Sequence, residues 1–305
     1  MIGRIALLAA VVVFCRPAGA SLVGDVRAAI ERGDLAAGER LVEMHRRANG
    51  ETPEVAAAVS WLGRGALQRN DLDRAERHAI EARRLALKLL DGRGLDDDRE
   101  LATALGASIE VQAQVLAARS ELSEAIAFLS GEANRWSATS ILARIHKNLN
   151  LLSLEGKPAP RLVWTEHLGS RPEPLEVLRG KVVLLFFWAH WCGDCKGQAP
   201  SLVRLSEEFG AQGFTVVGPT KRYGFAARGV DATVEEEMRH IEAVHRKFYA
   251  GIPGMAVPVS EESFVQYGCS TTPTLVLVDR KGIVRLYHPG EMRYEELASK
   301  VKELL

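Results

Sequence analysis

The apolar pattern of this chain changes character once, at residues 153–160, and this change limits the folds open to it. Before the change, Ala, Leu, Glu and Arg dominate, and apolar residues such as Leu85 and Leu89 recur at helical spacing. Residues 153–160 then interrupt the pattern with glycine and proline, and β-rich runs alternate with helical runs after them. A chain of 305 residues is long enough for two domains. We therefore predict an all-α domain over residues 21–152, a linker over 153–160 and an α/β domain over 161–305.

Three similar turns recur in the helical half, at Gly33-Asp-Leu35, Asn70-Asp-Leu72 and Ser120-Glu-Leu122. Each has a small or polar residue, an acid, a leucine, and Gly or Ala three residues after the leucine. A polar residue can end one helix, an acid suits the N-terminus of the next, and a small residue lets two helices approach. The pattern resembles tetratricopeptide repeats (TPR), although the turns are spaced more widely than the usual repeat of about 34 residues. Such a TPR-like domain buries apolar faces that one hairpin cannot bury, and it can also present a groove to a partner.

The N-terminus has the three parts of a secretory signal. A short basic region ends at Arg4, an apolar core runs over residues 5–14, and small residues stand at Ala18 and Ala20. We expect residues 1–20 to be a signal peptide, and the mature protein to be exported to the periplasm or another extracytoplasmic space. An uncleaved anchor is the alternative, but the apolar run is shorter than the roughly 20 residues that cross a bilayer.

Cysteine is used sparingly, at four positions. Cys15 lies in the predicted signal peptide, which leaves Cys192, Cys195 and Cys269 in an oxidising compartment. An odd number of cysteines argues against a framework of structural disulfides. A bridge between Cys192 and Cys195 would close too short a loop to restrain the unfolded chain, so a chemical role is indicated. Cys269 is expected to be a small buried hydrophobe, with a third redox thiol as the alternative.

The second half alternates predicted strands and helices. The expected strands are Val182–Trp188, Phe214–Pro219, Val257–Val259, Thr274–Val278 and Gly282–Tyr287, and the expected helices run over about 192–209, over 234–249 and from Tyr294 onward. Strands separated by helices should be parallel in the early part of the sheet, and a hairpin turn at Asp279-Arg-Lys-Gly282 adds antiparallel strands. An insertion between Thr220 and Tyr249 either covers the site as a lid or thickens an edge.

A Cys-x-x-Cys motif stands at the predicted strand-to-helix junction, in Phe187-Trp-Ala-His-Trp-Cys-Gly-Asp-Cys195. The accompanying motifs are Gly156-Lys-Pro-Ala-Pro160, Arg179-Gly-Lys-Val-Val183, Ala199-Pro200 and Tyr267-Gly-Cys-Ser-Thr-Thr-Pro-Thr274. Together they resemble the TlpA/ResA branch of the thioredoxin-like thiol-disulfide oxidoreductases, which have a redoxin domain of the AhpC/TSA type. The resemblance implies a thioredoxin-like α/β domain with a mixed central sheet flanked by helices. It also implies thiol-disulfide oxidoreductase activity with no metal or cofactor, only a redox-active disulfide between Cys192 and Cys195.

The expected chemistry follows from the position of the pair at the first turn of a helix. Unpaired backbone amides and the helix dipole there lower the pKa of Cys192, which makes it the nucleophile. Attack on a client disulfide gives a mixed disulfide, which Cys195 resolves. The resemblance further implies that Trp191 lies beside the nucleophile and that Thr272 and a cis Pro273 contact the substrate backbone. Simple packing is the alternative role for Trp191.

The sequence departs from the family at three places. Phe186 and Gln198 stand where thioredoxin and ResA-like proteins, respectively, carry an acid, so resolution depends on water or another base. Between the cysteines, Gly193 is followed by Asp194 instead of the common proline. A carboxylate there raises the pKa of Cys192, or it simply stabilises the start of the helix. We predict a reducing couple.

Other chemistries have less support. A peroxiredoxin would have Thr or Ser where Ala189 stands, haem attachment needs His where Lys196 stands, and zinc needs two more ligands near the pair. His190 is expected to be a surface residue. A different class of function is a partner-binding TPR-type protein with a regulatory redox domain.

The expected partners follow from a combined function in which the helical half selects what the redox half acts on. They are a disulfide-containing client protein and a redox protein that donates or accepts electrons, with a membrane-bound donor among the candidates. The 39 basic and 39 acidic residues give zero net charge, so no nucleic-acid partner is expected.

Overall fold

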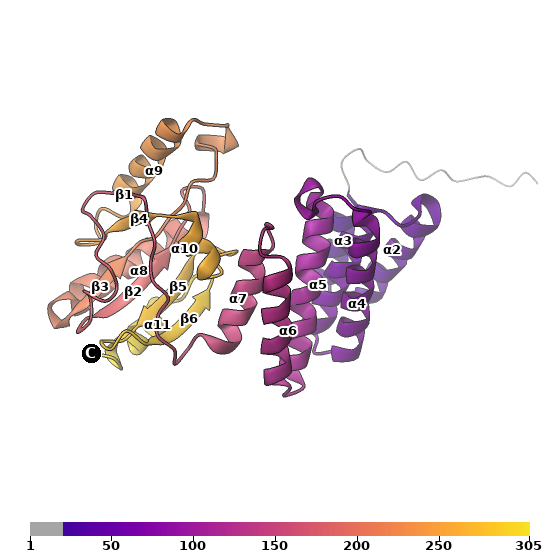
Figure 1. Ribbon diagram of the computed structural model, residues 1–305, viewed down its shortest axis with the longest axis horizontal. Helices are drawn as coiled ribbons and strands as arrows, with labels where there is room; N and C mark the ends of the chain where they lie inside the picture. Colours follow the sequence, from indigo (N-terminus) through magenta and orange to yellow (C-terminus); the bar gives the residue numbers. More distant parts are fainter. Residues whose placement is uncertain (1–20) are drawn as a thin grey trace, which may run out of the picture.

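The computed structural model describes residues 21–305, which form a helical half followed by an α/β half (Figure 1). The predicted signal peptide lies outside the described residues. The helices of the first half are α1 (Leu22–Glu31), α2 (Leu35–Asn49), α3 (Pro53–Gln68), α4 (Leu72–Leu90), α5 (Arg99–Ala118), α6 (Leu122–Arg135) and α7 (Leu142–Ser153), with a short 3-10 helix at Leu95–Asp97.

The three similar turns join α1 to α2, α3 to α4 and α5 to α6, and the helices of each pair pack together. Asp34 caps α2 by accepting a hydrogen bond from the Ala37 amide at 2.8 Å, and Asp71 caps α4 in the same way. Glu121, at the third turn, makes no side-chain capping bond. The predicted helix pairs are therefore confirmed, while their assignment to tetratricopeptide repeats stays a prediction.

Helix α5 is the centre of the helical half and packs against α3, α4, α6 and α7. It is long and apolar enough to cross a membrane, but most of its residues are buried inside the protein. Small residues let the helices come close, since a side chain added at Gly65 of α3 would meet Ile30 of α1 at 2.9 Å. The apolar composition of α5 is thus explained by its burial in the core of the helical half.

The α/β half contains a central sheet and a small second one. Its strands are β1 (Glu166–Leu168), β2 (Val182–Phe187), β3 (Phe214–Val217), β4 (Val257–Val259), β5 (Thr274–Val278) and β6 (Val284–Pro289). Its helices are α8 (Gly193–Phe209), α9 (Val234–Phe248), α10 (Glu261–Gln266) and α11 (Tyr294–Lys302), with 3-10 helices at Gly210–Gln212 and Ala227–Gly229. The predicted strands and helices are all present, and the structure adds β1 and α10, whose short lengths gave no periodic signal.

The central sheet has the strand order β3-β2-β5-β6. β2 pairs in parallel with β3 and antiparallel with β5, and β5 pairs antiparallel with β6, so the predicted mixture of orientations is confirmed. All of β2 is buried. Its side chains alternate between one core with α8, α9 and α11 and another with α10, because successive residues of a strand face opposite ways. The first cysteine therefore follows a fully buried central strand.

Helix α7 connects the two halves (Figure 1), since it packs against α5 and α6 on one side and against α10 and β6 on the other. The His146 ring lies 2.7 Å from the Val265 carbonyl oxygen, and Asn150 donates to the Gln266 carbonyl at 3.3 Å. Gly268 has a φ of 65°, and a Cβ there would lie 2.2 Å from the Lys147 amide nitrogen. The backbones of the two halves meet at this glycine.

The segment expected as a linker also runs along the α/β half. The Gly156 amide donates to the Val284 carbonyl at 2.8 Å, and the Val284 amide donates to the Lys157 carbonyl at 2.9 Å. The Glu155 carboxylate accepts a hydrogen bond from the Tyr287 amide at 3.0 Å. Residues 155–157 therefore add to the edge of the sheet at β6.

Candidate active site

Cys192 and Cys195 form a disulfide at the N-terminus of α8, with 2.21 Å between their sulfur atoms. Cys192 is the N-cap residue, and its Sγ accepts a hydrogen bond from the Cys195 amide at 3.0 Å. Both side chains are buried, with Cys192 4% exposed and Cys195 0% exposed. Unpaired amides and the positive end of the helix dipole face Cys192, and both stabilise a thiolate when the pair is reduced.

The Thr272–Pro273 bond is cis, as expected. Thr274 at the start of β5 pairs with Phe187 at the end of β2, and this pairing brings Thr272 next to the cysteines. The Thr272 carbonyl oxygen lies 3.4 Å from Cys192 Sγ. Segments about 80 residues apart in sequence therefore meet at the reactive sulfur.

Trp191 precedes Cys192 and is 50% exposed. The edge of its ring contacts Tyr223 of the insertion, with 5.5 Å between ring centroids. The Lys221 ammonium lies 5.0 Å from the Tyr223 ring centroid. Trp191 thus forms part of the surface beside the disulfide and is supported from one side by the insertion.

The two residues between the cysteines are exposed in the first turn of α8. Within residues 21–305, a Cβ built on Gly193 would meet nothing within 4 Å beyond its chain neighbours and the backbone of its own helix, so the approach to Cys192 is open there. The Asp194 carboxylate lies in the first turn, where the helix dipole favours a negative charge.

Gln198 and Phe186 stand at the two positions where ResA-like proteins and thioredoxin, respectively, carry an acid. The Gln198 amide donates to the Met292 carbonyl at 3.1 Å and accepts from the Met292 amide at 2.8 Å. Phe186 is buried and packs edge-on against Tyr249. Gln198 therefore pairs with the backbone and Phe186 packs in the core. Neither residue has a carboxylate that could take a proton from the cysteines.

Comparison with known proteins agrees with this geometry, because residues 156–287 match the AhpC/TSA family. The matched segment forms a redoxin domain of this type. The thiol-disulfide oxidoreductase ResA of Bacillus thuringiensis (strain Al Hakam) is 28% identical over 149 residues, which cover 49% of this chain and 78% of ResA. The thioredoxin-like protein YneN of Bacillus subtilis (strain 168) is 25% identical over 149 residues, which cover 48% of this chain and 78% of YneN. The redoxin domain is homologous to the ResA-type thiol-disulfide oxidoreductases.

Among solved structures, a crystal structure of a putative thiol:disulfide interchange protein DsbE from Chlorobium tepidum is similar to this half of the chain. It is 26% identical, covers 49% of this chain and 96% of its own, and has a TM-score of 0.38.

His190 contradicts the expectation of a surface position, since it is only 1% exposed. Its ring packs against Tyr223, Phe225 and His240 of the insertion. Its Nε2 lies 3.4 Å from the buried Glu237 carboxylate, which accepts hydrogen bonds from the Tyr223 and Gly224 amides. The expectation was wrong because the insertion folds over the segment before the cysteines. No local sequence pattern predicts this contact.

Burial lowers the pKa of His190, and the nearby His240 adds to this effect while Glu237 opposes it. A neutral imidazole is therefore favoured in the folded redoxin domain. Within residues 21–305, no group of three or more His, Cys, Asp or Glu side chains is arranged to hold a metal ion.

Cys269 is buried, as expected, at 7% exposed. Burial raises the pKa of its thiol well above the usual value, which keeps the sulfur protonated. A protonated thiol is a poor nucleophile, so the structure favours a packing role for this residue.

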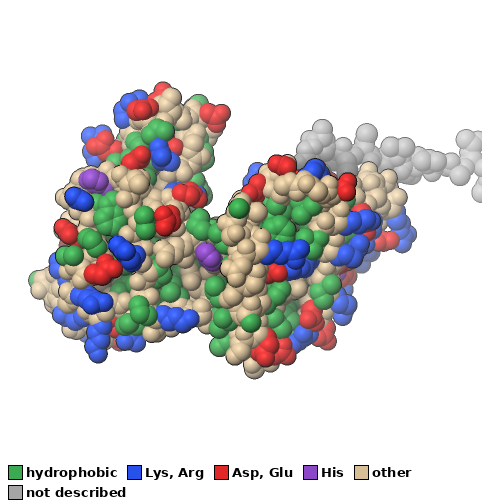
Figure 2. Space-filling model, in the orientation of Figure 1, with side chains coloured by type: hydrophobic (Ala, Val, Ile, Leu, Met, Phe, Trp, Pro, Cys, Tyr) green, Lys and Arg blue, Asp and Glu red, His purple; other side chains and the backbone are tan. Residues whose placement is uncertain are grey.

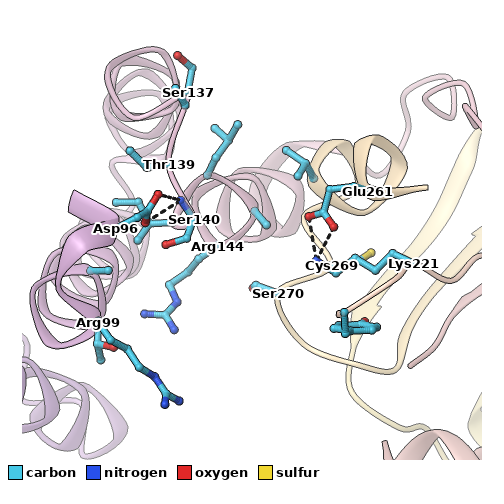
Figure 3. Close-up of a pocket in the computed structure, with 18 of the residues that line it drawn as sticks. Asp96, Arg99, Ser137, Thr139, Ser140, Arg144, Lys221, Glu261, Cys269 and Ser270 are labelled. Atoms are coloured by element: carbon cyan, nitrogen blue, oxygen red, sulfur yellow. Dashed lines mark hydrogen bonds and ion pairs between the residues drawn. The ribbon is translucent and has the colours of Figure 1, made fainter. Parts of the chain in front are cut away.

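A cleft of about 730 Å³ lies between the two halves (Figures 2 and 3). Its lining includes Trp191 and Thr272, which are neighbours of Cys192. Trp191, Lys221, Tyr223 and Thr272 line it from the redoxin domain, and Asp96, Arg99 and residues 137–144 line it from the helical half. The sequence did not predict that residues of the helical half line this cleft. The polar loop before α5 and the turn before α7 have no motif that indicates a binding surface.

Proposed function

We propose that this protein is an exported reductase of protein disulfides that acts through Cys192 and Cys195, with the helical half as its docking domain. The observation that carries the proposal is the position of Cys192 at the N-cap of α8, where the Cys195 amide already donates to its sulfur. The same interaction stabilises the thiolate of the reduced protein, which is the form that attacks a disulfide.

The reaction transfers two electrons from the dithiol to the client. The Cys192 thiolate attacks one sulfur of the client disulfide, the S–S bond breaks, and the other client sulfur leaves as a thiolate. The Cys195 sulfur then attacks Cys192 Sγ, which releases the second client thiolate and leaves the Cys192–Cys195 disulfide. Since Phe186 and Gln198 offer no carboxylate, the Cys195 proton passes to water or to the client thiolate. An electron-donating redox protein restores the dithiol.

The groups around Cys192 are proposed to hold the client during this exchange. The Thr272 carbonyl lies 3.4 Å from the attacking sulfur, so it can accept a hydrogen bond from an extended client backbone. Pro273 fixes the direction of that carbonyl, and the half-exposed Trp191 ring offers apolar contact. Gly193 leaves the approach open, and Asp194 modulates the stability of the thiolate.

Docking by the helical half is supported by the cleft that both halves line. In this proposal residues 21–152 are the docking domain, residues 153–160 the connection and residues 161–305 the catalytic domain. Export is supported by the apolar sequence of residues 5–14 and by the oxidising setting in which a disulfide reductase is needed.

The direction and the roles of the two cysteines are tested by two measurements on residues 21–305. Titration against dithiothreitol should give a potential near or below the roughly −270 mV of thioredoxin, and a value near −120 mV would make the protein an oxidant. Cys195→Ser should accumulate a mixed disulfide with a model client, whereas Cys192→Ser should accumulate none. Trapping on Cys195 in place of Cys192 would reverse the assigned roles.

A further inference from the structure

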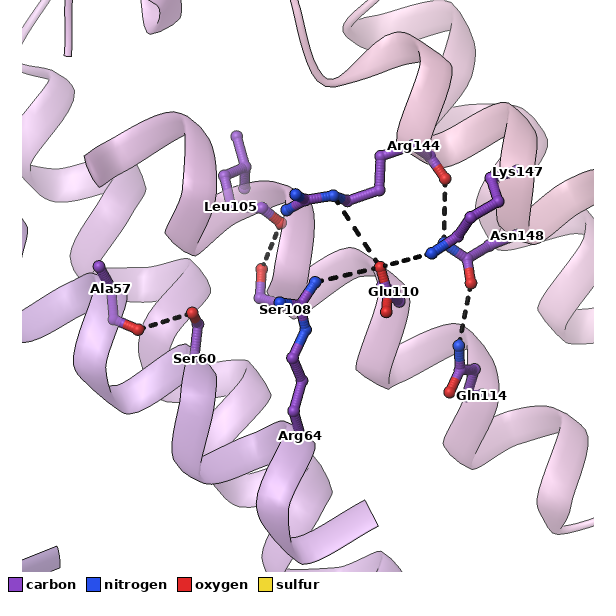
Figure 4. A network of polar contacts seen from close by, with 10 residues as sticks. All are labelled: Ala57, Ser60, Arg64, Leu105, Ser108, Glu110, Gln114, Arg144, Lys147 and Asn148. Carbon is purple, nitrogen blue, oxygen red and sulfur yellow. Dashed lines mark hydrogen bonds and ion pairs between the residues drawn. The ribbon is translucent and has the colours of Figure 1, made fainter. Parts of the chain in front are cut away.

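The helical wall of the cleft carries more positive than negative charge. In α5, Glu110 is the shared partner of three cations: Arg64 and Lys147 at 3.2 Å, and Arg144 at 4.0 Å (Figure 4). One carboxylate balances only one of these charges. Because the cluster is largely buried, the remaining charge is weakly screened by water.

Arg144 belongs to this cluster and also lines the cleft, so it places part of the excess positive charge at the cleft wall. Its buried Nη1 has no hydrogen-bond partner among the described residues. This nitrogen lies against Gly106 of α5 and is closed to the cleft, so the guanidinium is incompletely paired in the protein and an anion in the cleft would offset its charge. Burial lowers the pKa of Arg144, with repulsion from Arg64 as the second cause, and an added anion would relieve both effects.

Of the two acids among the described residues that line the cleft, only Asp96 lies on the helical wall, and its charge offsets only one of the two arginines there. Both oxygens of Asp96 accept from the Ser140 amide, at 3.1 and 3.0 Å. Glu261 is paired with Lys221 on the opposite wall, at 2.7 Å. Arg99 lies on the same wall as Arg144, is exposed, and has no ion pair within residues 21–305. Figure 3 shows Arg99 and Arg144 on the helical side and the Lys221–Glu261 pair on the redoxin side.

We propose that the cleft binds an acidic polypeptide segment of the client, whose carboxylates contact Arg99 and Arg144 while its disulfide lies against Cys192. This proposal rests on the proposed function and names the substrate class of that site. The cleft volume of about 730 Å³ lies within the roughly 300–1,000 Å³ of sites that enclose a ligand. A polypeptide fits better than a free anion, because the same cleft reaches Thr272, whose carbonyl can pair only with a donor such as a backbone amide.

The test compares two disulfide-linked peptides that differ only in charge, one with Asp and Glu around the cysteine and one with Asn and Gln. With the reduced protein (residues 21–305), the acidic peptide should react about tenfold faster, since charge-assisted contacts to arginine raise both the rate and the affinity. Arg99→Gln and Arg144→Gln should each bring this ratio toward one. Reaction with neutral bis(2-hydroxyethyl) disulfide should stay unchanged in both variants.

The matched control is Arg77→Gln, at an exposed arginine of α4 that does not line the cleft. This variant should keep the tenfold ratio. Equal rates for the two peptides, or an equal loss of the ratio in the control, would overturn the proposal. Arg99 is exposed, so its variant tests the cleft even where Arg144→Gln perturbs the Glu110 cluster.

Binding is also measured without chemistry, by calorimetry of Cys192→Ser with the same two peptides carrying Ser in place of Cys. Tighter binding of the acidic peptide, weakened by salt and by Arg99→Gln, supports the cleft even if the protein turns out not to reduce disulfides. Equal binding of both peptides overturns the cleft proposal, while activity on the neutral disulfide would leave the proposed reductase function standing.

Discussion

The two halves of this protein are assembled in different ways. In the helical half, each helix packs mainly against helices close to it in sequence, as in the pairs α3–α4 and α4–α5. In the redoxin half, the site unites the end of β2, the segment before β5 and the insertion, all distant in sequence. Function in the redoxin half is therefore concentrated in a few motif residues. In the helical half, the proposed docking function depends on which surface the helices leave facing the redoxin domain.

The two halves also differ in their proposed roles, which are thiol exchange in the redoxin half and client selection in the helical half. In the proposed function, Cys192 and its neighbours carry out thiol exchange in the redoxin half, and the unbalanced cations lie across the cleft in the helical half. The junction at α7 belongs to both halves, through its contacts with α5, α6, α10 and β6. Substitutions at the junction, in the helical core and in the redoxin core should therefore have effects of different sizes.

The largest effect is expected at the junction, from Gly268→Ala. The new Cβ would lie 2.2 Å from the Lys147 amide nitrogen, and alanine is strained at a φ of 65°. Because one backbone must move away from the other, we expect a loss of about 4–5 kcal/mol in the free energy of unfolding, measured by urea denaturation.

The matched control is Gly156→Ala, with a φ of 81° and, among the described residues, nothing within 4 Å of the added Cβ beyond its chain neighbours. Only the backbone strain applies there, so the loss should be about 1–2 kcal/mol. Equal losses in the two variants would show that the contact between the halves contributes little to stability. That result would contradict the view that the two halves are coupled at this junction.

A smaller effect is expected in the helical core, from Glu110→Gln. Burial alone would raise the pKa of Glu110, but Lys147, Arg64 and Arg144 together hold it below the usual value. Removing the carboxylate leaves these cations without a counter-charge and should lower the free energy of unfolding by about 3 kcal/mol. Since the pKa is depressed in the folded state, this contribution is present above about pH 4.5 and is lost as the pH falls further.

The control for Glu110→Gln is Glu51→Gln, on the surface. Lys88 and Arg84 lower the pKa of Glu51 to about 2, but water screens these pairs. Urea denaturation at pH 7 should show a much smaller change than for Glu110→Gln. A change as large as that of Glu110→Gln would mean that burial of the cation cluster is not what makes Glu110 important.

The parts of the molecule that could be predicted from sequence are those that a short pattern specifies. The Cys-x-x-Cys pair at the start of α8 and the cis bond before Pro273 follow from motifs, and the helix pairs follow from the recurring turn pattern of a polar residue, an acid and a leucine. Burial of His190, the α7 junction and the cleft could not be predicted in this way. Each depends on contacts between segments that are far apart in sequence and that carry no pattern of their own.

The smallest effect is expected in the redoxin core, and it concerns the pH dependence of the free energy of unfolding. Burial lowers the pKa of His190, and also that of His245, so the folded protein binds these protons less readily than the unfolded chain. Stability should therefore fall as the pH drops below about 6.5, where the unfolded imidazoles gain protons and the folded ones do not. One such histidine changes the free energy of unfolding by at most about 1.4 kcal/mol per pH unit. His190→Gln should reduce the slope of stability between pH 7 and pH 5 by part of this amount, measured by urea denaturation at each pH. The control is His167→Gln, at an exposed residue of strand β1. An unchanged slope in His190→Gln would mean that the insertion does not keep His190 buried in solution, and the insertion would then be a mobile cover over the site instead of part of its core.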